Sequence, residues 1–490
     1  MSATNPALGF QFVALWTDVA LWAMFAAGLG YAVRVWRHPT LRATWGRVLR
    51  DAPAVCSALV LGLFIAITAL DSVHLRRALP AAPGQDPART FYDTRTESLL
   101  DLALARPIAM RESTYSAPLG WQGMTKEPMV RDGLAVREPP RLAHGGAHLL
   151  QPEQQWAADV QWRALTGLAG GLALAVLVAL LAAVALRSAH GGFAAAAAAI
   201  LADRTRIPVR ALLLTVLAMA LFTGPVVALA GHYHVFGTDR TGNDVLVLSL
   251  KSIRTAFVIG LLSTLATLPF AVVLGIVAGW FKGWVDEVVQ YLYTTLSSVP
   301  NVLLIAACVL MVQVALDKHP EWFETSAERA DVKVFLLCVI LGVTGWATLC
   351  RLVRAETLKL RELEFVQAAT AFGVSPARTM ARHILPNVMH LVLISTVLNF
   401  SDLILYEAVL TYVGVGVDPG TSSFGSLING ARSEMSRDPV VWWSFAAAFG
   451  FMVALVLAAN LFADGVRDAL DPRARVLRPR LALRRPKAGV

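Results

Sequence analysis

Long apolar runs separated by short polar connections dominate the pattern of this chain. A helix needs roughly 20 apolar residues to cross the about 30 Å of hydrocarbon in a bilayer. About nine runs come close to that length, near residues 10–33, 54–70, 164–186, 209–230, 255–278, 299–316, 332–349, 388–406 and 441–462. A lone strand would leave its backbone groups unpaired in lipid, and the alternating segments of a barrel are absent from the sequence. The pattern predicts an all-α polytopic membrane protein with about nine transmembrane helices.

The composition supports this class. Of the 490 residues, 56% are hydrophobic and only 16% are charged, and the mean hydropathy is +0.58. Soluble globular chains average about 25% charged residues, so the charges here are too few to cover an aqueous surface. The net charge of +9 is explained by basic connections between membrane spans rather than by binding to nucleic acid.

The placement of charge along the chain predicts the orientation. Basic residues gather in the connections 34–50, 187–210 and 351–382 and in a tail from Arg473 onward, whereas the connection 317–331 is acidic. Because lysine and arginine mark cytoplasmic loops, the C-terminus is expected in the cytoplasm and, with nine spans, the N-terminus outside. No basic residue precedes the first span, which favours a retained anchor over a cleaved signal peptide.

The same pattern divides the chain into five regions. They are N-terminal transmembrane helices (1–70), a proline-rich extracytoplasmic loop or small domain (71–163), additional transmembrane helices (164–231), a compact five-span unit (232–475) with a cytoplasmic loop at 350–386, and a basic cytoplasmic tail (476–490). An alanine-rich surface helix is expected at 191–203, between two of the additional spans.

A polar segment at 236–245 leads into the fifth span. Thr238 or Asp239 can cap a short helix, and Gly242 permits a left-handed turn before Asn243 or Asp244 starts the next helix. The residues predict a tight, polar entry into the membrane at the outer face.

The connection 364–386 has the signals of two short helices with a bend. Gly373 is expected to end the first helix, Ser375 to cap the second and Pro376 to take its first position, while Pro386 closes the loop.

The side chains of this loop suit contact with another protein. Small residues (Ala368, Ala369) let another backbone approach, and aromatic residues (Phe365, Phe372) can fill pockets as anchors. Such an element, held between two spans, is suited to transmitting a push from a soluble partner.

These residues resemble the cytoplasmic coupling loop of ATP-binding-cassette importer permeases. The family pattern is Glu-Ala-Ala, three residues, Gly, about nine residues, and then Ile, one residue and Leu-Pro. The matching residues are Gln367, which replaces the usual glutamate, Ala368, Ala369, Gly373 and the adjacent Ile384, Leu385 and Pro386.

Further segments are similar to the peptide and nickel branch of that family. The stretch with Gly237, Thr238, Asp239, Gly242 and Asp244 is similar to its Leu-Gly-Thr-Asp motif, with Asn243 where arginine is usual. Residues 279–286, 412–417 and 464–473 resemble other motifs of the branch, so the resemblance covers about residues 236–475. Such permeases usually have one span before the Gly-Thr-Asp motif, whereas about four are expected here.

The resemblance implies the second, C-type permease of an importer of dipeptides, oligopeptides or nickel in a bacterial cytoplasmic (inner) membrane. The implied partners are a homologous second permease, two ATPase subunits, an external substrate-binding protein and membrane lipid, but no nucleic acid. ATP and Mg²⁺ are expected in the ATPase subunits, because this sequence has no Gly-x-x-x-x-Gly-Lys-Ser/Thr motif. No catalytic residue, cofactor or metal is expected in this chain.

Ionisable residues inside spans are costly and point to function. Asp402 and Glu407 are candidates for a translocation path, but they lie about 140° apart round a helix, and interhelical hydrogen bonding is an equal alternative. Asp18 is expected to pack against the added helices. The loop histidines, namely His144, His148, His232 and His234, are expected to be ordinary rather than metal ligands.

Two other functions remain open at the level of sequence. A proton-coupled secondary transporter would use Asp402 and Glu407 as a relay and would need no ATPase. A membrane anchor would use the segment 71–162 to bind an extracytoplasmic partner.

Overall fold

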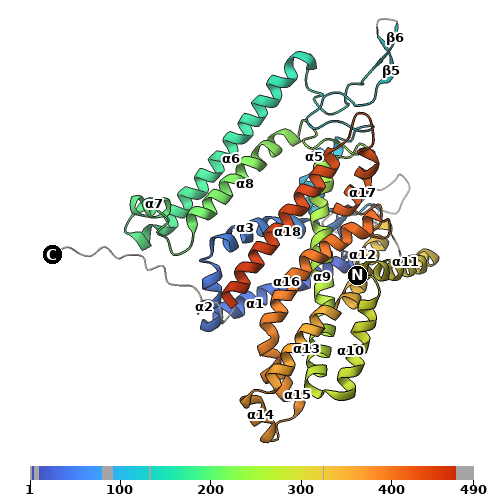
Figure 1. Cartoon of the computed structure of the whole chain (residues 1–490). Helices are drawn as coiled ribbons and strands as arrows, with labels where there is room; N and C mark the ends of the chain where they lie inside the picture. The colour runs from blue at the N-terminus through green and yellow to red at the C-terminus, as the bar shows by residue number, and fades with distance from the viewer. Residues whose placement is uncertain (1–2, 5–9, 80–91, 132–133, 324, 471–490) are drawn as a thin grey trace, which may run out of the picture.

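Helices make up most of the chain in the computed structural model, which describes residues 3–4, 10–79, 92–131, 134–323 and 325–470 (Figure 1). The helices of the first half are α1 (Trp16–Arg37), α2 (Pro39–Val48), α3 (Ala52–Asp71), α4 (Leu99–Ala103), α5 (Ala105–Ala109), α6 (Pro152–His190), α7 (Phe193–Leu201) and α8 (Val209–Ala230). Those of the second half are α9 (Val245–Phe281), α10 (Gly283–Ser298), α11 (Asn301–Lys318), η1 (Pro320–Trp322), α12 (Ser326–Gly345), α13 (Ala347–Arg361), α14 (Glu364–Ala371), α15 (Pro376–Thr379), η2 (Met380–Ile384), α16 (Leu385–Tyr412), α17 (Phe424–Glu434) and α18 (Trp443–Leu470).

The predicted all-α polytopic fold is confirmed. Within the described residues, eight helices are long and apolar enough to cross a membrane, or up to nine if α12 and α13, which are bent by 41° at Trp346, count as one span. The nine predicted runs correspond to α1, α3, α6, α8, α9, α11, α12 with α13, α16 and α18. The surface helix expected at 191–203 is α7, which follows α6 directly. The predicted basic tail, 476–490, lies outside the described residues.

Helix α9 is the central element of the second half. It is packed against α12, α13 and α16. One hydrophobic cluster surrounds its first half and another surrounds its second half. Two glycines one turn apart, Gly275 and Gly279, permit close approach to α13. A Cβ atom there would lie 2.9 Å from the carbonyl oxygen of Cys350 or 2.7 Å from the Cβ of Thr357, respectively. Small residues at such crossings let the two backbones pack closely inside a membrane.

The helices α1, α2 and α3 wrap the side of this unit. Helix α3 lies along α18 and also contacts α9, and Gly465 of α18 faces Ala54 of α3 so closely that a Cβ would lie 2.3 Å away. The short helix α2 reaches the end of α18, where Arg47 Nη1 donates to the carbonyl oxygen of Ala469 at 3.1 Å. The first two spans therefore belong to the same packed body as the second half.

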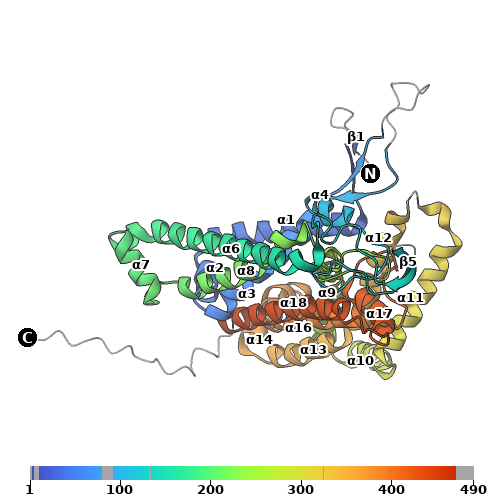
Figure 2. The same ribbon diagram turned by 90° about the horizontal axis from the view of Figure 1, so that it is seen from above.

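Helices α6 and α8 form a hairpin that stands apart. Figures 1 and 2 show it extending to one side, with α7 at its far end. The two helices meet through Gly167, Gly171 and Gly224; a Cβ on Gly171 would lie 2.3 Å from the carbonyl oxygen of Ala220. In the described part of the chain, the hairpin meets the bundle mainly where α8 contacts α3.

Short strands tie the N-terminus to the segment after α3. The strands β1 (Ala3–Thr4), β2 (Phe10–Val13), β3 (His74–Arg77) and β4 (Glu97–Ser98) form one antiparallel sheet in that order. A separate hairpin is made by β5 (Glu127–Arg131) and β6 (Leu134–Glu138). Because β2 precedes α1 and β3 follows α3, the sheet closes one end of the pair α1 and α3.

Candidate functional site

The candidate coupling loop runs from the end of α13 to the start of α16. Helix α14 ends as the glycine predicts: Gly373 has φ +76°, its amide donates to Thr370 O, and the amide of Val374 donates to Ala369 O. This is the pattern of a helix closed by a left-handed residue. Pro376 begins α15 as expected, but the side chain of Ser375 makes no capping hydrogen bond.

The second helix of the loop does not stop at Pro386. Instead, α15 passes into the π-helical turn η2 and then into α16, so that α15, η2 and α16 form one long helix. Proline lacks an amide donor and its ring clashes with the carbonyl four residues earlier. A wider π turn directly before Pro386 relieves that clash and keeps the helix continuous, which the sequence pattern did not indicate.

Buried residues fix the loop to the bundle. Val366 and Ile384 are 1% and 0% exposed, and both join the hydrophobic cluster that contains Trp346, Val353 and Val388. Most other members of the predicted loop face outward. Phe365 is 46% exposed and Phe372 is 88% exposed, Gln367, Ala368 and Pro386 are exposed, and Ala369 and Leu385 are partly buried.

The loop is thus a firmly held element with an uncovered aromatic face. Figure 1 places α14 and α15 at one tip of the molecule, at the opposite end from β5 and β6. A large apolar side chain left in water is unfavourable, and an exposed apolar patch on a rigid element marks a surface that another protein covers.

The Gly-Thr-Asp segment lies at the other end of the molecule. There the segment that follows α5 holds it through hydrogen bonds of Thr114 and Ser116 with Thr238, a contact that we call the clasp. The Thr238 hydroxyl accepts from Ser116 N at 2.6 Å and donates to Thr114 O at 2.9 Å, and Thr238 N donates to Ser116 O at 3.1 Å. Trp443 Nε1 donates to Thr238 O at 3.0 Å. No short helix forms here, so the predicted helix-capping role of Thr238 or Asp239 is wrong; Asp239 instead accepts from the amides of a tight turn, Thr241 N and Asn243 N.

The glycines of this segment make the clasp sterically possible. Gly237 and Gly242 have φ +69° and +77°, and a Cβ at Gly242 would lie 1.8 Å from the carbonyl oxygen of Glu112. Asp244 caps α9 by accepting from Leu246 N at 2.8 Å, as predicted.

A buried charged cluster completes the clasp. His234 Nδ1 lies 2.8 Å from Asp244 Oδ2, and His234 Nε2 lies 3.5 Å from Glu112 Oε1, an ion-pair distance rather than a good hydrogen bond. Glu112 also accepts from the amides of Ala143, His144 and Gly145 at 2.8 to 3.0 Å.

The cluster shifts the acid-base behaviour of its members. Burial alone would lower the pKa of His234, but the contacts with Asp244 and Glu112 outweigh it and raise the pKa to about 9. Burial alone would raise the pKa of Glu112, but His234 and the three amides lower it to about 2. The histidine is therefore charged and bound between two carboxylates at neutral pH.

The two acidic residues of α16 are not brought together. Glu407 is 1% exposed and accepts from Thr411 Oγ1 at 2.8 Å, close to Gly425 of α17. Asp402 is exposed, on the face of α16 that also carries Leu398, Leu405 and Val409. Their role in a translocation path stays a prediction.

Comparisons with known proteins identify the family of this chain. Residues 271–476 match the family described as "Binding-protein-dependent transport system inner membrane component". The oligopeptide transport system permease protein OppC of Mycobacterium tuberculosis is 32% identical over 248 residues, which are 51% of this chain and 79% of that protein. The chain belongs to this family.

Two further relatives define the branch. OppC of Escherichia coli K12 is 31% identical over 50% of this chain and 74% of its own length, and the dipeptide transport system permease protein DppC of Lactococcus lactis is 30% identical over 49% and 64%. The protein is a C-type permease subunit of an ATP-binding-cassette importer and a multi-pass protein of the bacterial inner membrane. The resemblance in the second half is thereby confirmed.

The permease is joined to its added first half by a buried charge network. Arg254 Nη2 of α9 donates to Asp18 Oδ1 of α1 at 2.5 Å and lies 3.8 Å from Asp331 of α12. Asp18 also bonds His74 Nδ1 at 2.7 Å, and Thr17 N donates to Asp331 at 3.0 Å. Asp18 was expected to pack against the added helices; it does contact His74, but its main partner is a residue of the permease core.

Several residues that matter here were not singled out from the sequence. Glu112 and Ser116 lie in a stretch without periodicity, and Arg254 lies at the start of an apolar run. Charged residues are tolerated at the edge of a span, so the position of Arg254 just before the predicted run 255–278 gave no signal. For Glu112 and Ser116 no local signal exists, because their role depends on contacts with residues more than a hundred positions away.

Proposed function

We propose that this permease subunit pairs with a homologous second permease and two ATPase subunits to import peptides or similar small solutes. The relatives that carry the substrate part of this proposal are permeases of oligopeptide and dipeptide transport systems. In this proposal ATP and Mg²⁺ are bound by the ATPase subunits, and this chain contributes no catalytic residue.

The observation that carries the proposal is the 88% exposed ring of Phe372 on a loop anchored by Val366 and Ile384. We assign Phe372, Phe365 and the small residues between them to contact with an ATPase subunit. Val366 and Ile384 pack against residues of α13 and α16. A movement of the loop would therefore move these two helices directly, because the packed contact leaves no flexible linker between them.

The orientation follows from the same assignment. If α14 meets a cytoplasmic ATPase, the opposite end with the Gly-Thr-Asp clasp lies outside. The pairing of β2 with β3 supports an external N-terminus, because it puts residues 10–13 beside the segment after α3. An external substrate-binding protein would then meet the segment after α5, which holds the Gly-Thr-Asp residues.

The uncovered face of α16 is assigned to the solute path or to the second permease. It carries Asp402 between Leu398 and Leu405. A gradient-driven relay between Asp402 and Glu407 is not favoured, because Glu407 is enclosed against α17 while Asp402 points away from it.

Co-purification from membranes that also contain the ATPase subunits tests the proposal. Phe372→Ala should weaken retention of the ATPase by roughly tenfold or more, the scale of a lost aromatic anchor. Phe193→Ala is the matched control, since Phe193 is an exposed phenylalanine of α7, outside the coupling loop. Equal retention in both variants would rule out the coupling role of Phe372, and wild-type protein that drives uptake without any ATPase would overturn the importer assignment.

A further inference from the structure

A groove lies between the added helices and the permease core. It encloses about 260 Å³ and is bounded by α1 and α3 on one side and by α9, α16 and α18 on the other. The residues that line it are Met24, Leu61, Ile65, Phe257, Leu261, Thr264, Leu265, Leu268, Thr396, Val397, Phe400, Ala459 and Phe462. Met24, Leu61 and Ile65, which come from α1 and α3, lie outside residues 271–476, the part that matches the family model.

The lining is chemically suited to a hydrocarbon chain. Its polar side chains are two threonines, and each hydroxyl is satisfied within its own helix: Thr264 Oγ1 donates to Gly260 O and Thr396 Oγ1 donates to Val392 O, both at 2.6 Å. A peptide in this groove would leave its backbone groups without partners, which is costly.

The length of the groove matches one leaflet. From Phe257 to Leu268 it follows eleven residues of α9, a distance of about 16 Å at the rise of an α-helix. Half of a typical hydrocarbon core is about 15 Å.

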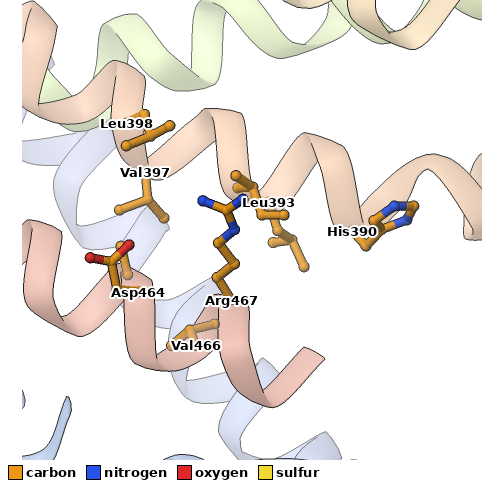
Figure 3. Close-up of a pocket in the computed structure, with 9 residues that line it drawn as sticks. His390, Leu393, Val397, Leu398, Asp464, Val466 and Arg467 are labelled. Atoms are coloured by element: carbon orange, nitrogen blue, oxygen red, sulfur yellow. The ribbon is translucent and has the colours of Figure 1, made fainter. Parts of the chain in front are cut away.

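A smaller hollow of about 50 Å³ continues the groove toward the end of α18. It shares Val397 with the groove and is lined by His390, Leu393, Ile394, Leu398, Ala463, Asp464, Val466 and Arg467 (Figure 3). Figure 3 shows the Arg467 guanidinium directed toward α16, and the carboxylate of Asp464 pointing to a different side.

The basic groups of this hollow have bonding capacity to spare. Within the part of the chain that the structure describes, the Arg467 guanidinium makes no hydrogen bond or ion pair, and His390 uses only Nδ1, at 2.7 Å from Asn387 O. Four exposed arginines, Arg34, Arg37, Arg42 and Arg50, lie on the α1–α2–α3 connection, which reaches the same end of α18 through the bond from Arg47 to Ala469. Basic clusters beside transmembrane helices attract anionic headgroups.

We propose that the groove binds one anionic phospholipid, with an acyl chain between α3 and the core helices and its headgroup phosphate at Arg467. The site lies on the same side of the membrane as the coupling loop, which is the cytoplasmic leaflet in the orientation proposed above. The bound lipid fills the space between the added helices and the core, so it stabilises the contact of α1 and α3 with α9, α16 and α18.

Native mass spectrometry of the full-length permease in mild detergent tests the site. Phosphatidylglycerol and phosphatidylcholine with identical chains are the probes. Arg467→Gln should weaken phosphatidylglycerol binding by about fivefold, as expected for one basic side chain worth about 1 kcal/mol at a membrane surface. It should weaken phosphatidylcholine binding less, because the choline cation offsets the charge of the phosphate. Arg206→Gln, on the connection between α7 and α8 and away from the hollow, is the control and should leave phosphatidylglycerol binding unchanged.

A second pair of variants probes the chain-binding part. Ile65→Trp fills the groove from α3 and should reduce binding of both lipids, whereas Leu63→Trp, on the same helix but outside the lining, should not. Equal effects of Arg467→Gln and Arg206→Gln, or unchanged binding in Ile65→Trp, would overturn the site.

If a variant does not yield folded protein, the site can be tested in the wild-type protein by photo-crosslinking with a diazirine-bearing phosphatidylglycerol. Adducts are expected in peptides that contain residues 390–400 or 459–467. Adducts confined to other helices, or crosslinks from this groove to the second permease in the assembled complex, would contradict the proposal.

Discussion

Asp18 and Arg254 form a buried ion pair of 2.5 Å that joins the first helix of the chain to the central helix of the permease core. Both residues lie outside residues 271–476, the part that matches the family model, but Arg254 belongs to α9, which continues into that part. The pair is supported by His74 and Asp331, which come from β3 and α12. The added helix α1 is therefore held to the core by a buried ion pair as well as by apolar packing.

Removal of one partner from this pair should be costly. Asp18→Ala leaves the guanidinium of Arg254 buried with the Thr17 hydroxyl and the more distant carboxylate of Asp331. Breaking a buried pair typically costs about 3–5 kcal/mol. We expect a clear drop in the thermal unfolding temperature of the detergent-purified protein, and partial recovery in Asp18→Leu combined with Arg254→Leu.

The exposed carboxylate of Asp402 serves as the control for that experiment. Asp402→Ala removes an aspartate from a span without unpairing a buried partner in the described structure. A stability loss equal in both single variants would mean that the pair has no special role.

The clasp on the Gly-Thr-Asp segment should be broken by a single methyl group. Gly242→Ala puts a Cβ 1.8 Å from the carbonyl oxygen of Glu112 at a φ of +77°, a conformation that costs an alanine about 1–2 kcal/mol even without the clash. The segment 110–151 should become sensitive to limited proteolysis while the spans stay protected.

The matched control is Gly231→Ala in the same connection. Gly231 has φ −86° and nothing within 4 Å of its would-be Cβ. Cleavage that is the same in both variants would show that the clasp does not depend on Gly242.

The cluster around His234 predicts how the clasp depends on pH. The pKa of His234 is raised from 6.5 to about 9, so its contribution is complete below pH 6.5 and is lost as the pH rises through about 9. The pKa of Glu112 is lowered from 4.5 to about 2, so its contribution is complete above pH 4.5 and is lost as the pH falls toward 2. The clasp should be firmest between about pH 4.5 and 6.5.

Hydrogen exchange measures this directly. The amides of Ala143, His144 and Gly145, which bind Glu112, should lose protection between pH 6.5 and 9 after correction for the intrinsic exchange rate. His234→Gln should abolish that dependence. Protection that stays constant over this range in the wild type would refute the charged state assigned to His234.

The coupling loop yields a prediction about transport. Gly373→Pro cannot keep a φ of +76°, because proline is fixed near −65°. The end of α14 should change direction and move Phe372, so ATP-driven uptake should fall by roughly tenfold or more while the protein still inserts into the membrane. A bulky residue at Ala369, on the same half-exposed surface, should act similarly.

Gly373→Ala is the milder variant for comparison, since alanine tolerates the left-handed conformation at a cost of about 1–2 kcal/mol. It should reduce uptake less than proline does. Full uptake in Gly373→Pro vesicles would mean that the geometry of this loop is not needed for coupling.

The parts of this fold that the sequence predicts are those that depend on local physics. Apolar length marked the spans, and Gly373, Pro376, Gly242 and Asp244 lie where left-handed residues and helix starts require them. Each of these follows from the conformational preference of one residue and its near neighbours.

The parts that escaped prediction are pairings between distant segments. Nothing beside Asp18 in the sequence indicates Arg254, and nothing beside Thr238 indicates Ser116, although these contacts hold the added regions to the core. The π turn before Pro386 was also missed, because it depends on the spans on both sides holding the helix in line.

The bond from Arg47 to the carbonyl oxygen of Ala469 has a consequence for biogenesis. Carbonyl groups in the last turn of a helix lack intrahelical hydrogen-bond partners. Here Arg47 of α2, between α1 and α3, donates a hydrogen bond to one of them. That arginine leaves the ribosome early, whereas its partner is among the final residues of α18 to be synthesised. Helices α1 to α3 therefore reach their final packing only after α18 has been synthesised, and membrane chaperones can engage them during that interval.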